Sequence, residues 1–217
     1  MAHVKVIPWR GIKAVALDLD GVLVDAPELH KEALNEALKD FGLSGISEEE
    51  HKTKYNGLPT KTKLEMLGLG PDWIAKINTS KQRKTVELID KFIKPDPEML
   101  DKIDRLSQNM PLCCCSNSVR ASVDRLLECA GLDGFMTFTL SNEDVKQPKP
   151  APDIYILAAE KFGISAHRLF VVEDNANGIL AATRAGCKIC PVENTKWSRE
   201  YVKNMLFAYE DQLLWTE

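Results

Sequence analysis

The sequence predicts an α/β fold in which a doubly wound parallel sheet carries an inserted α-helical cap. Short, continuously apolar runs alternate with helical patterns, which is typical of parallel strands covered by helices on both faces. One long stretch, residues 26–94, has no such run and is rich in glutamate and lysine. We therefore expect a sheet domain formed by residues 1–25 and 95–217, and a helical cap domain formed by residues 26–94.

Five apolar runs have the length of buried strands, and in chain order they are KAVALDL, PLCCCS, FMTFTL, RLFVVED and KICPV. Helical spacing of apolar residues follows the second, third and fourth of these runs. The three helical patterns end close to Gly131, Gly163 and Gly186, and glycine commonly terminates a helix. Ser118 is the candidate N-cap of the first of these helices.

The cap begins with a clear amphipathic pattern. Its apolar residues fall on one face of a helix and are Leu29, Ala33, Leu34, Ala37, Leu38 and Phe41. Ser47 and Glu50 have the spacing of a capping box, which predicts the start of a second helix. The stretch 94–97, with its two prolines, is expected to be the hinge that returns the chain to the sheet domain.

Composition places the chain among ordinary globular proteins. It has 217 residues, 44% hydrophobic and 28% charged, with a formal net charge of −4. This charge offers no general attraction to nucleic acid or to anionic membranes, and no apolar segment approaches the ~20 residues that span a bilayer. The N-terminus lacks the apolar core of a signal peptide, so we expect a cytoplasmic protein. All six cysteines are expected to be buried, reduced and structural.

Polar residues gather where the predicted strands end. In an open parallel sheet, ligands bind beyond the carboxyl ends of the strands, so these residues should lie together. The set contains several carboxylates, no histidine and one lysine, which suits Mg²⁺ beside an anion and argues against zinc. A carboxylate in such a place is a plausible nucleophile toward phosphorus. The residues are Asp18, Asp20, Ser116, Asn117, Lys149, Glu173 and Asp174.

The ordered motifs DLDGVLVD, CSNS, KQPKPAPD and VVEDNANG resemble those of the haloacid dehalogenase superfamily. The resemblance is to its branch of small phosphatases and β-phosphoglucomutases, and it leaves out only the N-terminal dozen residues and the C-terminal FAYEDQLLWTE. It implies a Rossmann-like core with a helical cap. It also implies Mg²⁺-dependent hydrolysis of a small phosphorylated metabolite, such as a sugar phosphate or a phosphoglycolate-like compound, through an aspartyl phosphate.

The resemblance also implies roles for individual residues. Asp18 would be the nucleophile, and Asp20 would protonate the leaving oxygen and later activate water. Ser116 and the backbone amide of Asn117 would bind phosphoryl oxygens. Lys149 would bind both the phosphoryl group and the nucleophile.

The implied metal site uses residues from two strands. Mg²⁺ would be held by Asp18, by the backbone carbonyl of Asp20 and by Asp174. Glu173 would contact the ion directly or indirectly. His30, at the start of the cap, is expected either to bind substrate or to orient Asp20.

Each motif also has a purely structural interpretation. Asp20 and Gly21 alone are a hairpin signal, Lys149 alone is a solvated loop lysine, and the remaining polar residues alone are helix caps or an acidic loop. Only their joint occurrence favours a metal-dependent site. The lysine-rich cap stretch is likewise either a solvated face or a place where an anionic part of the substrate touches one of Lys52, Lys54, Lys61 and Lys63.

Two other functions stay open at this stage. The first is a β-phosphoglucomutase-like phosphoryl transferase, whose relatives carry an arginine three residues after the cap glycine and a lysine three residues after the serine of CSNS. Here, counted from Gly57 and Ser116, those places hold Thr60 and Val119, although Lys61 or Arg120 could substitute. The second is a catalytically silent binding protein on the same fold.

Overall fold

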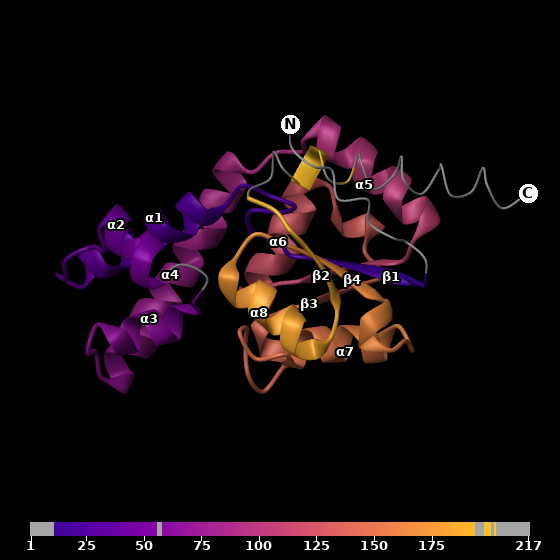
Figure 1. Cartoon of the computed structure of the whole chain (residues 1–217). Coiled ribbons are helices and arrows are strands. Elements are labelled where there is room, and N and C mark those ends of the chain that lie inside the picture. Colours follow the sequence, from indigo (N-terminus) through magenta and orange to yellow (C-terminus); the bar gives the residue numbers. More distant parts are fainter. Residues whose placement is uncertain (1–10, 56–57, 194–197, 201, 203–217) are drawn as a thin grey trace, which may run out of the picture.

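The computed structural model describes residues 11–55, 58–193, 198–200 and 202 (Figure 1). Its described strands form one parallel sheet in the order β3-β2-β1-β4-β5. Their bounds are β1 (Ala14–Leu17), β2 (Leu112–Cys115), β3 (Phe138–Leu140), β4 (Leu169–Glu173) and β5 (Lys188–Pro191). Each falls inside one of the five predicted runs. The strand order reverses at β1, so β1 ends between β2 and β4.

Helices cover both faces of the sheet, as the doubly wound class requires. Figure 1 shows α5 (Pro97–Asn109) and α6 (Arg120–Ala130) on one face, and α7 (Asp153–Lys161) and α8 (Ala176–Ala185) on the other. Three short turns join these elements: η2 (Asp133–Phe135), η3 (Asn142–Asp144) and η4 (Ala166–Arg168). Gly131 and Gly186 end their helices with positive φ, as predicted.

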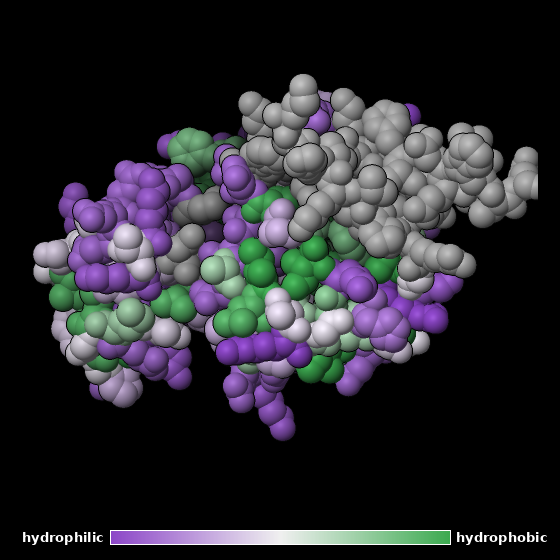
Figure 2. Space-filling model, in the orientation of Figure 1, coloured by the Kyte–Doolittle hydropathy of each residue, from purple (hydrophilic) through white to green (hydrophobic). Residues whose placement is uncertain are grey.

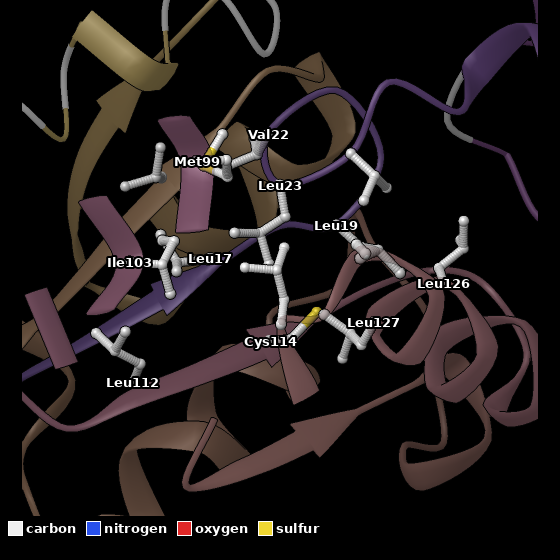
Figure 3. Packing of buried hydrophobic residues seen from close by; sticks show 14 of the residues in the cluster. Leu17, Leu19, Val22, Leu23, Met99, Ile103, Leu112, Cys114, Leu126 and Leu127 are labelled. Atoms are coloured by element: carbon white, nitrogen blue, oxygen red, sulfur yellow. The ribbon is translucent and has the colours of Figure 1, made fainter. Parts of the chain in front are cut away.

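The alternation of side chains along β1 separates two hydrophobic cores. Val15 and Leu17 pack toward α5 and α6, whereas Ala14 and Ala16 pack toward α7 and α8. Figure 3 shows the first core, where Leu17 lies among Ile103, Leu112 and other buried side chains. Because both faces of the central strand are fully buried, any charge at its end must be balanced inside the protein.

A helical region is inserted between β1 and β2, and its helices before α5 form a lobe beside the sheet (Figure 1). The elements are α1 (Pro27–Asp40), α2 (Glu48–Glu50), η1 (His51–Tyr55), α3 (Thr60–Met66) and α4 (Pro71–Phe92), followed by α5. The predicted apolar face of α1 is divided between two clusters. Leu34, Ala37 and Leu38 are buried inside the lobe, whereas Leu29 and Ala33 pack into the core of the sheet domain, and Phe41 lies just beyond the helix and is only partly buried. The capping box of Ser47 and Glu50 is confirmed.

On the face shown in Figure 2, the upper part of the lobe is polar, although the lobe also exposes apolar side chains such as Met66 and Trp73. Figure 2 shows hydrophilic residues over α2 and the neighbouring part of α1, while hydrophobic residues are visible over α8 of the core. Leu180 of α8 is among the exposed apolar side chains. In the part of the chain that the structure describes, no helix is both long and apolar enough to cross a membrane.

Two local predictions were wrong. Ser118 does not cap α6, because the N-cap position is taken by Val119 and the Ser118 hydroxyl donates to Asp20 instead. The alternative hairpin interpretation of Asp20 and Gly21 corresponds in the structure to a turn at Gly21, with φ of +89°, and an isolated bridge between Asp20 and Val24. Two of the six free cysteines, Cys129 and Cys187, are only partly buried.

Candidate active site

The carboxyl ends of β1, β2 and β4 face the lobe across a cavity of about 230 Å³. Every residue that the sequence singled out for the site lines this cavity. These residues are Asp18, Asp20, His30, Ser116, Asn117, Lys149, Glu173 and Asp174. Six of the eight are the last residue of a strand or lie within three residues after one, so the sheet topology brings these six together.

Lys149 is the central cation of the site. It is 3% exposed, and its Nζ donates to Asp18 Oδ1 at 2.6 Å, Glu173 Oε1 at 2.5 Å and the carbonyl oxygen of Cys115 at 2.8 Å. Burial by itself would lower the pKa of Lys149, but the two carboxylates raise it well above its usual range. An ammonium has three N–H donors and all three are used here. To bind a phosphoryl oxygen, Lys149 must release one of these partners.

The side chain of Asn117 fixes the loop that carries Lys149. Its amide nitrogen donates to the Lys149 carbonyl at 3.1 Å, and its oxygen accepts from the Lys149 amide at 2.9 Å. This pair joins the end of β2 to a loop that is 32 residues further along the chain. The side chain therefore positions Lys149, and the role expected for Asn117 in phosphoryl binding stays a prediction for its backbone amide.

Three carboxylates form an acidic cluster beside Lys149. Asp18, Glu173 and Asp174 each offer an oxygen, and these oxygens lie within 4.8 Å of one another. Burial, and next the charge of Glu173, raise the pKa of Asp18 well above its ordinary value. The same two causes raise the pKa of Asp174 to about 7. One lysine does not balance this much negative charge.

The cluster fits a hard divalent cation. Oδ1 of Asp174 is buried and has no hydrogen-bond partner among the described residues, so it is an oxygen in need of a ligand. Oxygen ligands alone suit Mg²⁺. The backbone also makes room for the carboxylates, because a Cβ atom added at Gly21 would overlap Asp174 and one added at Gly178 would overlap Glu173.

Glu173 is held from several sides. Besides Lys149, its Oε1 accepts a hydrogen bond from the Tyr155 hydroxyl at 2.9 Å, and its Oε2 accepts from the Asn175 amide at 3.2 Å. Burial, followed by the charge of Glu173, raises the pKa of Tyr155 well above its usual value, so the phenol keeps its proton. These contacts fix the Glu173 carboxylate, which in turn positions Lys149 beside the acidic cluster.

Asp20 lies opposite the cap and is linked to it by hydrogen bonds. His30 Nε2 lies 3.0 Å from Asp20 Oδ1, and the Lys81 ammonium lies 3.3 Å from His30 Nδ1. Because an ammonium can only donate, Nδ1 must accept and Nε2 carries the proton that it donates to Asp20. Burial would raise the pKa of Asp20, but His30, Lys81 and Ser118 together lower it below its ordinary value.

Ser116 provides a hydroxyl at the end of β2. Its Oγ accepts a hydrogen bond from the Ser118 amide at 3.0 Å, and the side chain is almost fully buried at the cavity wall. The hydroxyl can therefore donate its own proton to an oxygen of a ligand. Ser118 itself donates to Asp20 Oδ2 at 3.3 Å, which adds a further contact to that carboxylate.

Comparison with known proteins decides the family. Residues 15–192 match the model of the haloacid dehalogenase-like hydrolases. The chain belongs to this family. A phosphoglycolate phosphatase from Photorhabdus laumondii is 28% identical over 94% of this chain and 89% of its own. The fructose-1-phosphate phosphatase YqaB of Escherichia coli is 29% identical over 78% of this chain and 90% of its own.

A solved structure agrees with the sequence relatives. CbbY from Rhodobacter sphaeroides, crystallised in complex with phosphate, is 27% identical to this hydrolase and superposes with a TM-score of 0.74. The match covers 83% of this chain and 86% of CbbY. The protein is a haloacid dehalogenase-like hydrolase, and these relatives do not single out one substrate for it.

Sequence reasoning missed two residues of the hydrolase site, Lys81 and Tyr155. Lys81 follows Ile77 and precedes Thr85 at steps of four along the buried face of α4, so a charged residue at an apolar position was the available signal. Tyr155 belongs to the buried face of α7, where an aromatic residue looks like ordinary core. Nothing in the sequence indicated that its hydroxyl meets Glu173.

The cap lysines of the hydrolase fall into distinct groups. Lys63 is buried at the cavity wall, and Lys61 also lines the cavity but stays mostly exposed. Lys52 and Lys54 are exposed and lie outside it. Arg120 pairs with Asp144 and Thr139, so it does not supply the missing cation of a mutase. Thr60 and Val119 line the cavity, whereas Gly57 lies outside the described residues.

Replacing Gly178 with alanine is expected to lower Mg²⁺ affinity and phosphate release at least tenfold. The new methyl group would displace the Glu173 carboxylate, and disturbing a group that supports a metal site commonly costs ~10–100-fold in affinity. Alanine normally stabilises a helix by ~1 kcal/mol relative to glycine, so lost activity in a well-folded variant would be diagnostic. Calorimetric titration of the variant with Mg²⁺ measures the affinity, and the Gly134→Ala protein is the control. Gly134 has open space around its Cα.

Proposed function

We propose that this protein is a cytoplasmic, Mg²⁺-dependent phosphatase that hydrolyses a small phosphorylated metabolite through an aspartyl phosphate on Asp18. A sugar phosphate or a phosphoglycolate-like compound is the substrate class, and residues 26–94 are the cap over the site. The observation that carries the proposal is the buried Asp18–Lys149 pair beside a cluster of carboxylates at one end of the cavity.

The first step is attack of the Asp18 carboxylate on phosphorus. Lys149 holds Oδ1, which leaves Oδ2 as the attacking oxygen. As the bond between Asp18 and phosphorus forms, the ester P–O bond breaks and the leaving oxygen takes a proton from Asp20. Proton transfer of this kind is typically worth ~10²–10⁴-fold in rate. Ser116 and the Asn117 amide bind the phosphoryl oxygens in this scheme.

The second step is hydrolysis of the aspartyl phosphate. Asp20, now ionised, takes a proton from water while the water oxygen bonds to phosphorus. The bond between phosphorus and Asp18 breaks, inorganic phosphate leaves and the Asp18 carboxylate is restored. The lowered pKa of Asp20 in the free protein suits this base role. As an acid, Asp20 must first be protonated. The negative charge of an incoming phosphate favours the protonated form by raising the pKa of Asp20.

Mg²⁺ would be held by Asp18, by the backbone carbonyl of Asp20 and by Asp174, with Glu173 as a direct or indirect partner. When bound, the ion neutralises part of the negative charge on the phosphoryl oxygens and on the nucleophile. The raised pKa of Asp18 and of Asp174, together with the unpartnered Asp174 oxygen, supports this assignment.

The runner-up is a β-phosphoglucomutase-like phosphoryl transferase. Sequence reasoning disfavoured it because two cations of the mutase pattern are missing. The structure weakens that argument, since Lys63 and Lys81 both line the cavity from the cap. We retain the phosphatase because Arg120 is engaged elsewhere and because two of the relatives compared above are named as phosphatases. A silent binding protein would not require the complete motif set that lines this cavity.

Phosphate release from a panel of phosphorylated metabolites should be detectable with Mg²⁺ and should be lost after EDTA treatment. Excess Mg²⁺ should restore it, which controls for damage by the chelator. Full activity in EDTA would contradict the metal assignment. The same assay should include β-glucose 1-phosphate with a bisphosphate primer. If conversion to glucose 6-phosphate were faster than phosphate release, the protein would be a mutase and the phosphatase proposal would be wrong.

A further inference from the structure

The cavity has two ends of opposite charge. Its core end carries the acidic cluster with Lys149. Its cap end is lined by Lys61, Lys63 and Lys81, together with two histidines, and no described carboxylate lines the cavity from the cap. The core end has Lys149 and, in the proposed function, would also hold Mg²⁺. At the cap end Lys61 has Glu65 within 3.9 Å, so the positive charge left without a described carboxylate partner is that of Lys63 and Lys81.

Lys63 is the least compensated of these cations. It is 8% exposed, and its ammonium makes no hydrogen bond or ion pair with any residue that the structure describes. Burial lowers its pKa to about 8, which the charge of Asp20 only partly opposes, so it is mainly protonated at neutral pH. A buried, unpaired ammonium is costly, and proteins normally pair such a group. Lys81 differs because it already contacts His30.

His51 lies at the same end of the cavity and also lacks a partner. It is 7% exposed, and its Nε2 is buried without a hydrogen bond among the described residues. Burial and the nearby Lys63 lower its pKa to about 4, so the ring is neutral. Two polar side chains, both at least nine-tenths buried, thus face this part of the cavity with unused hydrogen-bonding capacity.

We propose that Lys63, with His51 beside it, binds a second anionic group of the substrate while the phosphoryl group lies at Asp18. This rests on the proposed function and narrows its substrate class. The preferred substrate carries a carboxylate or a second phosphate at the end remote from the scissile ester. A neutral-ended monoester leaves Lys63 buried and uncompensated, so it binds less well.

Lys63 could instead influence the reaction through its electrostatic interaction with Asp20, whose charge raises the pKa of Lys63. The two roles differ in what they do to matched substrates. An effect through Asp20 changes turnover of every phosphomonoester by the same factor. Binding of a remote anion changes only the ratio between anionic-ended and neutral-ended substrates. The ratio is therefore the quantity to measure.

The test compares substrates that share a carbon chain length and differ in their remote group. The pairs are 2-phosphoglycolate with 2-hydroxyethyl phosphate, and ribulose 1,5-bisphosphate with ribulose 5-phosphate. In the parent protein, kcat/KM for one anionic-ended member should exceed that of its neutral-ended partner by about 10–100-fold, as expected for hydrogen bonds to a charged group. The pair with the larger ratio shows whether the site prefers a carboxylate or a second phosphate as the remote group.

Lys63→Met should bring that ratio close to one, while Lys63→Arg should retain part of it. Lys52→Met is the matched control, because Lys52 is an exposed cap lysine paired with Glu48 outside the cavity. A ratio near one in the parent protein, or equal losses on both members of a pair, would overturn the proposal. The parent ratios need no variant, so a misfolded Lys63→Met protein does not prevent the test.

A binding measurement separates this inference from the proposed reaction. Calorimetry with Asp18→Asn protein and Mg²⁺ should show 2-phosphoglycolate or ribulose 1,5-bisphosphate binding about tenfold or more tightly than its neutral-ended partner, again the scale of hydrogen bonds to a charged group. If no substrate releases phosphate but this preference persists, the phosphatase is wrong and the anion site stands. If phosphate is released and the preference is absent from both pairs, the anion site is wrong and the phosphatase stands.

Discussion

Replacing Asp18 with asparagine is expected to abolish phosphate release, with a loss of at least ~10⁴-fold in kcat, the scale of deleting a catalytic nucleophile. The new side chain would keep the shape of the aspartate and its contact with Lys149, but an amide cannot attack phosphorus. No phosphorylated protein should be detected by mass spectrometry after rapid acid quench. Retention of near-normal kcat would require a different nucleophile.

The fold should tolerate this change. Burial and Glu173 keep the pKa of Asp18 raised, which means that its ionised form is unfavourable in the metal-free protein. Removing that charge relieves repulsion with Glu173 and Asp174. Metal-free Asp18→Asn protein should therefore unfold at no lower urea concentration than the parent. Loss of activity can then be assigned to chemistry.

Asp20→Asn is the sharpest comparison for the nucleophile variant. It should lower turnover by ~10²–10⁴-fold, the usual worth of a general acid or base. Phosphorylation of Asp18 by an aryl phosphate should survive, since an aryl oxide leaves without protonation, and the phosphoenzyme should accumulate. Asp25→Asn is the matched control, because Asp25 is exposed and lies outside the cavity. Equal loss of both half-reactions would argue against the role proposed for Asp20.

Topology explains why so much of the core site could be predicted from sequence. Asp18, Ser116 and Glu173 each follow or end a continuous apolar strand, and parallel strands place their carboxyl ends at one edge. The approximate strand positions therefore sufficed, even though each strand is shorter than its apolar run. Register errors of one residue would not have moved these side chains to the other end of the sheet.

The cap resisted the same reasoning because its contribution depends on which helix face meets the cavity. The chemically similar Lys52 and Lys63 differ entirely in burial, and composition alone cannot tell them apart. Lys81 reaches His30 across 51 residues, a contact fixed only when α1 and α4 pack. Ser118 was mistaken for a cap for a related reason: serine suits an N-cap, and only tertiary structure brings Asp20 within reach of its hydroxyl.

Replacing Lys149 with methionine should lower kcat/KM by ~10³-fold or more and should also destabilise the metal-free protein. The variant loses three hydrogen bonds and the only described cation in direct contact with Asp18 and Glu173. Loss of one preorganised donor at a reacting group typically costs ~10²–10³-fold. Breaking a buried ion pair from one side costs ~3–5 kcal/mol in stability, because the partner charge stays buried.

Two comparisons distinguish catalysis from structural support. Lys102→Met is the matched control, since Lys102 is also a buried lysine with one carboxylate partner, Glu98, but lies on α5 away from the cavity. It should leave kcat/KM close to that of the parent. Lys149→Arg should also have low activity. The donors of a planar guanidinium cannot take the arrangement of the three N–H donors on the single ammonium nitrogen.

A double variant then isolates the charge balance. Adding Glu173→Gln to Lys149→Met removes one of the two carboxylates left without a counter-charge, so urea unfolding of the metal-free double variant should return toward that of the parent. Its kcat/KM should not recover, because Asp18 still lacks the cation that orients it. If Lys149→Met lost less than about tenfold in kcat/KM, well below the scale of a preorganised charge at the reacting group, Lys149 would only balance the buried carboxylates. If activity returned together with stability in the double variant, the lysine would be supporting the fold and the proposed electrostatic role would be wrong.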